Sequence, residues 1–100
     1  MRLALNISGD ANRDLEAIAD YIGANYGLSS SDRFIAGITA RLKQLAQFPM
    51  MGPSREEIAP GFRSLIYERY LILYVVQENS LNVMRVVSGY QDLTELFGDE

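Results

Sequence analysis

Two arginines and three tyrosines in the second half of the chain are the residues best suited to chemistry. Arg63 and Arg85 carry planar guanidinium groups that can hold a phosphate or a carboxylate through two parallel hydrogen bonds. Tyr67, Tyr70 and Tyr74 follow within one turn-containing stretch among aliphatic residues. Tyrosine and arginine are enriched where one protein binds another. These residue types therefore indicate a surface that binds an anion or a protein partner.

Groups that would turn such a surface into an enzyme site are scarce. The sequence has no histidine, which is the commonest general base near neutral pH and the commonest metal ligand. It has no cysteine, and its only lysine is Lys43. Asp14, Glu16 and Asp20 share one side of a predicted helix, which we interpret as a solvated face rather than a divalent-metal site. We therefore predict no catalytic residue, no metal site and no cofactor.

Length and composition frame these residues within a single domain. A chain of 100 residues, 48% of them hydrophobic, suits one domain with one core, spanning 1–100. The formal net charge of −4 argues against a generic nucleic-acid binder. No apolar run is long enough to span a membrane, and the start lacks a signal-peptide pattern. We expect a cytoplasmic protein without a membrane segment.

Two helices are predicted in the first half, after a short strand in which Leu3, Leu5 and Ile7 alternate with smaller or polar residues. The first helix is expected between an N-cap at Ser8 and a C-cap at Gly27. Serines 29–31 are expected to cap the second helix, which ends before Pro49. The helical stripes contain Ala11, Leu15, Ile18, Ile22 and Tyr26 in the first helix and Phe34, Ile35, Ile38, Leu42 and Leu45 in the second. Because few residues join the helices, we expect an antiparallel hairpin.

Three strands are predicted in the second half. Residues 49–61 contain three prolines and two glycines, which indicates a loop. The hydrophobic period then changes to two, which predicts strands at 62–67, 70–77 and 81–88, joined by short turns into an antiparallel meander. A short helical turn is expected at 92–97. The predicted class is α+β, an antiparallel sheet in β-α-α-β-β-β order with the helical hairpin on one face.

The turn lengths predict which side chains share a face of the sheet. A two-residue turn after Tyr67 places it opposite Tyr70, and pairing 76 with 81 places Arg85 on the same side. We expect this side to be open and the other side to pack under the helices; the latter carries Ile66, Leu71, Leu73, Val75, Met84 and Val86. Alternatively, the tyrosines are half-buried strand residues and the arginines pair with Glu68 or Asp92. We favour a binding surface, since large exposed apolar patches rarely lack a partner.

Three segments resemble a known family. SGDANRDLEAIADYI (8–22) resembles the opening helix of ParE-type toxins of the RelE/ParE superfamily. LAQFPMMGPSREEIAPGFRSLIYERYLILYVV (45–76) resembles their helix end, Pro-Gly loop and central hairpin, and VMRVVSGYQDL (83–93) resembles the last strand and its exit. The likeness covers nearly the whole chain in order. It implies a RelE/ParE-like fold and the toxin of a type II toxin–antitoxin system.

The resemblance also implies a function without catalysis. ParE-like toxins act on DNA gyrase and are neutralised by a ParD-like antitoxin, which carries the contact with operator DNA. We expect the antitoxin to contact both helices and the tyrosine face, at Leu15, Ile18, Ile22, Phe34, Ile38, Leu65, Tyr70, Ile72 and Tyr74. We expect a toxicity or anion-binding patch at Arg63, Arg85, Tyr90 and Gln91.

Two alternatives remain open. A RelE-like ribosome-dependent mRNA endonuclease would use several basic groups and an aromatic residue after the last strand, for which Arg63, Arg85 and Tyr90 are the candidates. The lack of histidine and the single lysine argue against it. Gln91 stands where ParE-like toxins often have an arginine, so the chain is alternatively an inactive remnant or has another target.

Overall fold

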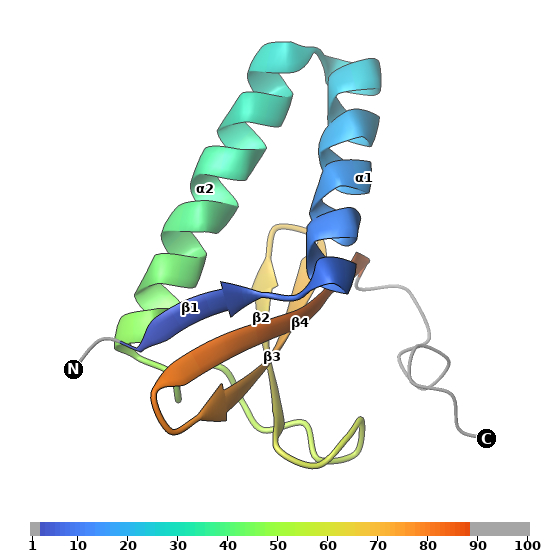
Figure 1. Cartoon of the computed structure of the whole chain (residues 1–100). Helices are drawn as coiled ribbons and strands as arrows, with labels where there is room; N and C mark the ends of the chain where they lie inside the picture. Colours follow the sequence, from blue (N-terminus) through green and yellow to red (C-terminus); the bar gives the residue numbers. More distant parts are fainter. Residues whose placement is uncertain (1–2, 89–100) are drawn as a thin grey trace.

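The computed structural model describes residues 3–88, and both helices lie on one side of a four-stranded sheet (Figure 1). The elements in chain order are β1 (Ala4–Ile7), α1 (Gly9–Tyr26), α2 (Leu28–Gln47), β2 (Phe62–Tyr67), β3 (Tyr70–Gln77) and β4 (Ser80–Ser88). This order confirms the predicted α+β class. The helical turn predicted at 92–97 lies outside the described residues. Within residues 3–88, neither helix is long and apolar enough to cross a membrane.

A single residue joins the two helices. Gly27 has φ 98°, a backbone conformation that glycine tolerates best, and it both ends α1 and precedes α2. Because the chain reverses within one residue, α2 begins at Leu28, ahead of the serines expected to cap it. One of these serines, Ser31, is buried instead and donates its hydroxyl to the carbonyl oxygen of Ala19 at 3.0 Å. This hydrogen bond joins α2 to α1 close to the tip of the hairpin.

The sheet has the order β1-β4-β3-β2. The last three strands form the predicted antiparallel meander, with Tyr67 opposite Tyr70 and Val76 opposite Leu81. β1 runs parallel to β4, so the sheet is mixed rather than wholly antiparallel. A long connection through both helices separates β1 from the meander, and such a connection permits parallel pairing whereas a short turn does not.

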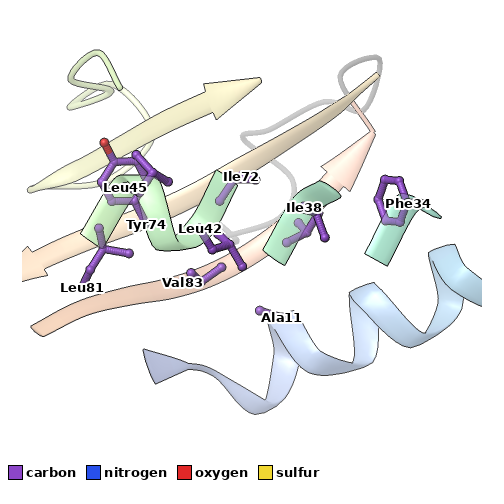
Figure 2. Packing of buried hydrophobic residues seen from close by; sticks show 10 residues of the cluster. Ala11, Phe34, Ile38, Leu42, Leu45, Ile72, Tyr74, Leu81 and Val83 are labelled. Atoms are coloured by element: carbon purple, nitrogen blue, oxygen red, sulfur yellow. The ribbon is translucent and has the colours of Figure 1, made fainter. Parts of the chain in front are cut away.

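The tyrosine side of the sheet lies under the helices, opposite to the prediction. Figure 2 shows α2 residues of the core facing Ile72, Tyr74 and Val83 of the sheet. Tyr74 is 0% exposed. The side expected to be covered carries a smaller cluster, formed by Phe62, Leu71, Leu73 and Val87 with Ile58, Ala59, Val75 and Met84 packed against it. The chain's own helices thus cover the face that we expected to be open.

A β-bulge in β4 also changes the predicted parity. Leu73 pairs with Arg85 while Tyr74 pairs with Val83, so Met84 is an extra residue on β4. An extra residue shifts every later side chain to the other face. Val86 therefore joins the core under the helices, which corrects its predicted place on the other side.

Candidate functional site

An open groove of about 700 Å³ lies between the tip of the helical hairpin and the turn that joins β2 to β3. Four tyrosines line it: Tyr21 and Tyr26 from α1, Tyr67 from β2 and Tyr70 from β3. Arg33, Glu68 and Arg69 supply charged groups at its walls. We call this region the tyrosine groove.

An aromatic cluster forms the floor of the tyrosine groove. Phe34 of α2 is almost fully buried, and its ring centroid lies 5.6 Å from that of Tyr67 and 5.3 Å from that of Tyr70. The Phe34–Tyr70 pair meets edge to face, a favourable arrangement for aromatic rings. Burial raises the pKa of the Tyr67 and Tyr70 phenols, and the Glu68 carboxylate adds to the effect. Both hydroxyls therefore stay protonated at neutral pH.

Gly37 allows Tyr67 to lie directly against α2. A Cβ atom at position 37 would stand 1.9 Å from the Tyr67 hydroxyl oxygen and 2.9 Å from its Cζ. Any larger residue would overlap the ring. Glycine in a helix interior costs about 1 kcal/mol relative to alanine, and here the cost coincides with a close approach that shapes the groove.

The rim of the tyrosine groove is unusually apolar for an exposed surface. Tyr21 is 53% exposed, Tyr26 67% and Leu28, beside them at the hairpin tip, 79%. Large exposed apolar groups gathered at one place indicate a binding surface rather than a random scatter. Together with the two arginines, the groove contains the residue types typical of binding hot spots.

Asp14 and Arg85 form a second polar centre, which we call the α1–β4 clamp. Arg85 donates Nε–H to Asp14 Oδ2 at 2.7 Å and Nη2–H to Oδ1 at 3.0 Å. The backbone N–H of Val86 donates to the same Oδ2 at 2.9 Å. The hydrogen bond and charge of Asp14 raise the pKa of Arg85. Asp14 is thus an ion-pair partner, which corrects its interpretation as part of a solvated acidic face.

The N-cap of α1 contacts the same part of β4. As predicted, Ser8 caps the helix: its Oγ accepts the N–H of Ala11 at 3.0 Å. The same hydroxyl donates to the carbonyl oxygen of Met84 at 2.9 Å. The bulged residues of β4 therefore find hydrogen-bond partners at the start of α1.

The other predicted arginine, Arg63, lies on β2, across β3 from Arg85. Arg63 donates Nη1–H to the carbonyl oxygen of Gly52 at 2.7 Å. The Tyr74 hydroxyl donates to the carbonyl oxygen of Pro49 at 2.7 Å and accepts the N–H of Gly52 at 3.0 Å. These bonds fix the loop 49–61 against β2 and β3, and we call this region the closed end.

The structure separates the residues predicted for the toxicity patch. Arg63 turns to the loop and Arg85 to α1, and β3 lies between their strands. The two arginines therefore do not form a common patch. Tyr90 and Gln91 lie outside the described residues, so their part of the prediction stays a prediction.

The predicted antitoxin contacts divide by burial. Ile38, Ile72 and Tyr74 are 0–1% exposed inside the chain's own core, so the prediction of direct contact is wrong for them. Ile72 and Tyr74 lie on the face of the sheet that the helices cover, and Ile38 lies on the side of α2 that packs against that face. Phe34 is buried beneath the groove and contributes its floor. The remaining predicted contacts are half-buried; they are Leu15, Ile18, Ile22, Leu65 and Tyr70.

Sequence reasoning missed most of the groove. Ile22, Phe34 and Tyr70 are among the predicted contacts, whereas Tyr21, Arg33 and Gly37 are not. Tyr26 was assigned to the apolar stripe of α1, whereas the hairpin tip leaves it exposed. The one available signal was the glycine inside an amphipathic helix, which often marks a packing or functional requirement.

The sequence matches a protein family and is similar to named proteins. Residues 5–93 match the family described as "ParE toxin of type II toxin-antitoxin system, parDE". Toxin ParE3 of Caulobacter vibrioides is 23% identical over 92 residues, which cover 92% of this chain and 88% of that protein. Toxin ParE1 of Mycobacterium tuberculosis is 26% identical over 88 residues, with coverages of 87% and 90%.

Solved structures show the same fold. A chain of the chromosomal ParDE toxin–antitoxin system of P. aeruginosa superposes with a TM-score of 0.76 at 24% identity, covering 87% of this chain and 96% of that one. A chain of the RelBE2 toxin–antitoxin complex of Mycobacterium tuberculosis superposes with a TM-score of 0.62 at 23% identity, with coverages of 88% and 99%.

Proposed function

This chain belongs to the ParE toxin family of type II toxin–antitoxin systems, and we propose that it arrests growth by binding DNA gyrase and is neutralised by a ParD-like antitoxin. The observation that carries the proposal is the family match over residues 5–93, which includes both helices and all but the first residue of the sheet. The named structural relatives are described as members of toxin–antitoxin systems. Both proposed interactions would take place in the cytoplasm.

The toxin acts in this proposal by binding and not by catalysis. The absence of histidine removes the usual general base near neutral pH. The two arginines considered for phosphate binding each have an acceptor within the chain, Gly52 for Arg63 and Asp14 for Arg85. A phosphate would have to compete with the Asp14 carboxylate for the positive charge of Arg85, and with the Gly52 carbonyl oxygen for one N–H of Arg63.

The antitoxin contacts that we propose lie on the half-buried and exposed surface. They comprise Leu15, Ile18 and Leu65, which pack against the edge of the core, and Ile22 and Tyr70, which line the tyrosine groove. These side chains present apolar area that a wrapping segment would bury. The antitoxin would also carry the complex to operator DNA, since the acidic toxin is a poor ligand for DNA by itself.

Two assays run side by side test the proposal. Purified toxin is added to a gyrase supercoiling reaction and to translating ribosomes loaded with a defined mRNA. We expect loss of supercoiling, its recovery when the antitoxin is added, and intact mRNA. Cleavage of the mRNA would replace the gyrase proposal with a RelE-like endonuclease. Normal growth of cells that make the intact toxin alone would identify an inactive remnant.

A further inference from the structure

We propose that the tyrosine groove holds an amphipathic segment of the antitoxin, with an apolar anchor over Phe34 and Tyr70 and carboxylates facing Arg33 and Arg69, and that Gly37 keeps the groove open for it. This inference rests on the proposed function, because it assigns the antitoxin a place on the toxin. It adds the chemistry of the bound segment and a residue that controls access.

The shape and lining of the groove favour a peptide segment. Its floor is an aromatic surface of Phe34, Tyr67 and Tyr70, and its volume of about 700 Å³ is open to solvent between two elements. Exposed Tyr21 and Tyr26 continue the apolar area along the rim. One large apolar side chain of a helical or extended segment would pack against the floor. The rest of that segment would cover the rim.

Charge determines which segment fits best. The chain carries a formal net charge of −4, so an acidic partner is repelled by the molecule as a whole. The groove is a local exception, because its walls carry two arginines and one glutamate. Arg33 extends from α2 and Arg69 from the β2–β3 turn, on opposite walls. Carboxylates on both sides of an apolar anchor would match this arrangement, and would direct the segment to the groove.

Gly37 acts as a gate through Tyr67. A Cβ at position 37 would overlap the hydroxyl oxygen of Tyr67 at 1.9 Å. That oxygen is the far end of a side chain that can rotate, so the ring would move away from α2 while the backbone stays in place. Gly37 and Tyr67 both line the groove, so the displaced ring would occupy space that the segment needs. Alanine favours a helix more than glycine does, so Gly37→Ala would push the Tyr67 ring into the groove without breaking the helix.

The first experiment tests the charge. The probe is the ParD-like antitoxin encoded with this toxin, purified separately, and its dissociation constant is measured by titration calorimetry. We expect Arg33→Glu to weaken binding about tenfold, less so at high salt. Lys43→Glu is the matched control, since Lys43 is also exposed on α2 and the net charge changes equally; we expect an effect below about twofold. Equal effects of the two substitutions would overturn the charge assignment.

The second experiment tests the gate. Gly37→Ala should weaken antitoxin binding at least tenfold, while the circular dichroism spectrum and the thermal midpoint stay close to those of the unmodified protein. Adding Tyr67→Phe removes the closest overlap, that with the hydroxyl oxygen, and leaves the one with Cζ, so it should restore part of the lost affinity. If Gly37→Ala weakens binding and Tyr67→Phe restores none of it, the assignment of the gate to Tyr67 is wrong.

The outcomes separate this inference from the proposed function. If the antitoxin binds the unmodified toxin but Gly37→Ala and Arg33→Glu leave its affinity unchanged, the groove is not the docking site and only the present inference falls. If the unmodified toxin does not bind the antitoxin, the proposed neutralisation fails as well.

Discussion

Tyr70 and Tyr74 lie on the same face of the same strand, four residues apart, and have different surroundings. Tyr74 is fully buried, and its hydroxyl bridges Pro49 and Gly52 of the loop. Tyr70 is half-buried at the tyrosine groove, and none of the hydrogen bonds described within residues 3–88 involves its hydroxyl. The difference lies in what covers each ring: the loop 49–61 seals one end of α2, and the hairpin tip leaves the other open. The Tyr74 hydroxyl therefore supports the fold, whereas the Tyr70 ring is available to a partner.

Two glycines repeat this comparison. Gly52 at the closed end makes room for the Tyr74 hydroxyl and for the carbonyl oxygen of Ser64, which would lie 2.7 Å and 2.2 Å from a Cβ. Gly37 at the tyrosine groove makes room only for a side chain, the hydroxyl end of the Tyr67 ring. Backbone cannot move aside as a ring can, so the same substitution should have different consequences at the two ends.

The largest effect is expected at Gly52. Gly52→Ala should lower the free energy of unfolding by about 2–3 kcal/mol, because the new methyl group overlaps a backbone oxygen in a packed region. Gly37→Ala should change it by less than about 1 kcal/mol, since the gain in helix propensity offsets the displacement of Tyr67. Urea unfolding of both variants measures the difference. A larger loss at Gly37 would show that the comparison is wrong.

Tyr74→Phe should have the next largest effect. It leaves the Gly52 N–H and the Pro49 carbonyl without their phenol partner in a buried place, which should cost about 1–2 kcal/mol. Because the closed end lies away from the groove, we expect the affinity for the antitoxin to stay within about twofold of the unmodified value. Equilibrium unfolding and calorimetric titration of one preparation give both quantities.

Alkaline pH should lower the free energy of unfolding through Tyr74 at the closed end. Burial raises the pKa of Tyr74 above its ordinary value of about 10. The folded protein therefore keeps the proton at a pH where the unfolded chain loses it, and stability declines as the pH rises past 10 toward the folded pKa. We expect the urea midpoint to fall between pH 9 and pH 11, and to fall less in Tyr74→Phe. An identical fall in both proteins would assign the effect to other groups.

The smallest effect is expected for Tyr70→Phe. Removing this hydroxyl leaves the contact with Phe34 in place, so the free energy of unfolding should change by less than about 0.5 kcal/mol. The substitution is chemically the same as Tyr74→Phe and serves as its matched control. Similar losses for both variants would remove the distinction between the two ends.

The helices and strands could be predicted from the sequence, but the face of the sheet that the helices cover could not, and the reasons are physical. Periodicity and turn residues are local, so the strand limits and the pairing of Tyr67 with Tyr70 could be predicted and are confirmed. Which face of the sheet the helices cover depends on how the side chains of each face pack against α2. That packing depends on the whole fold and not on any one segment. The bulge at Met84 had no local marker in the sequence, and it places Val86 instead of Arg85 opposite Ile72.

The groove was harder to predict than the core. Its walls come from three separate segments, and Arg33 and Arg69 line it from α2 and from the β2–β3 turn, which no spacing in the sequence connects. Gly37 could have been noticed as a break in a helical pattern. Its role depends on Tyr67, thirty residues later in the chain, and only the coordinates connect the two.

The α1–β4 clamp has a consequence for how the protein is made. Asp14 pairs with Arg85, 71 positions later, and within residues 3–88 the strand that pairs with β1 is β4, the last of the four described strands. While the chain is still emerging from the ribosome, α1 can pack only against α2, and β1 has no strand to pair with. The sheet can be completed only after β4 has been synthesised, so a fragment released before that point would lack the assembled surface.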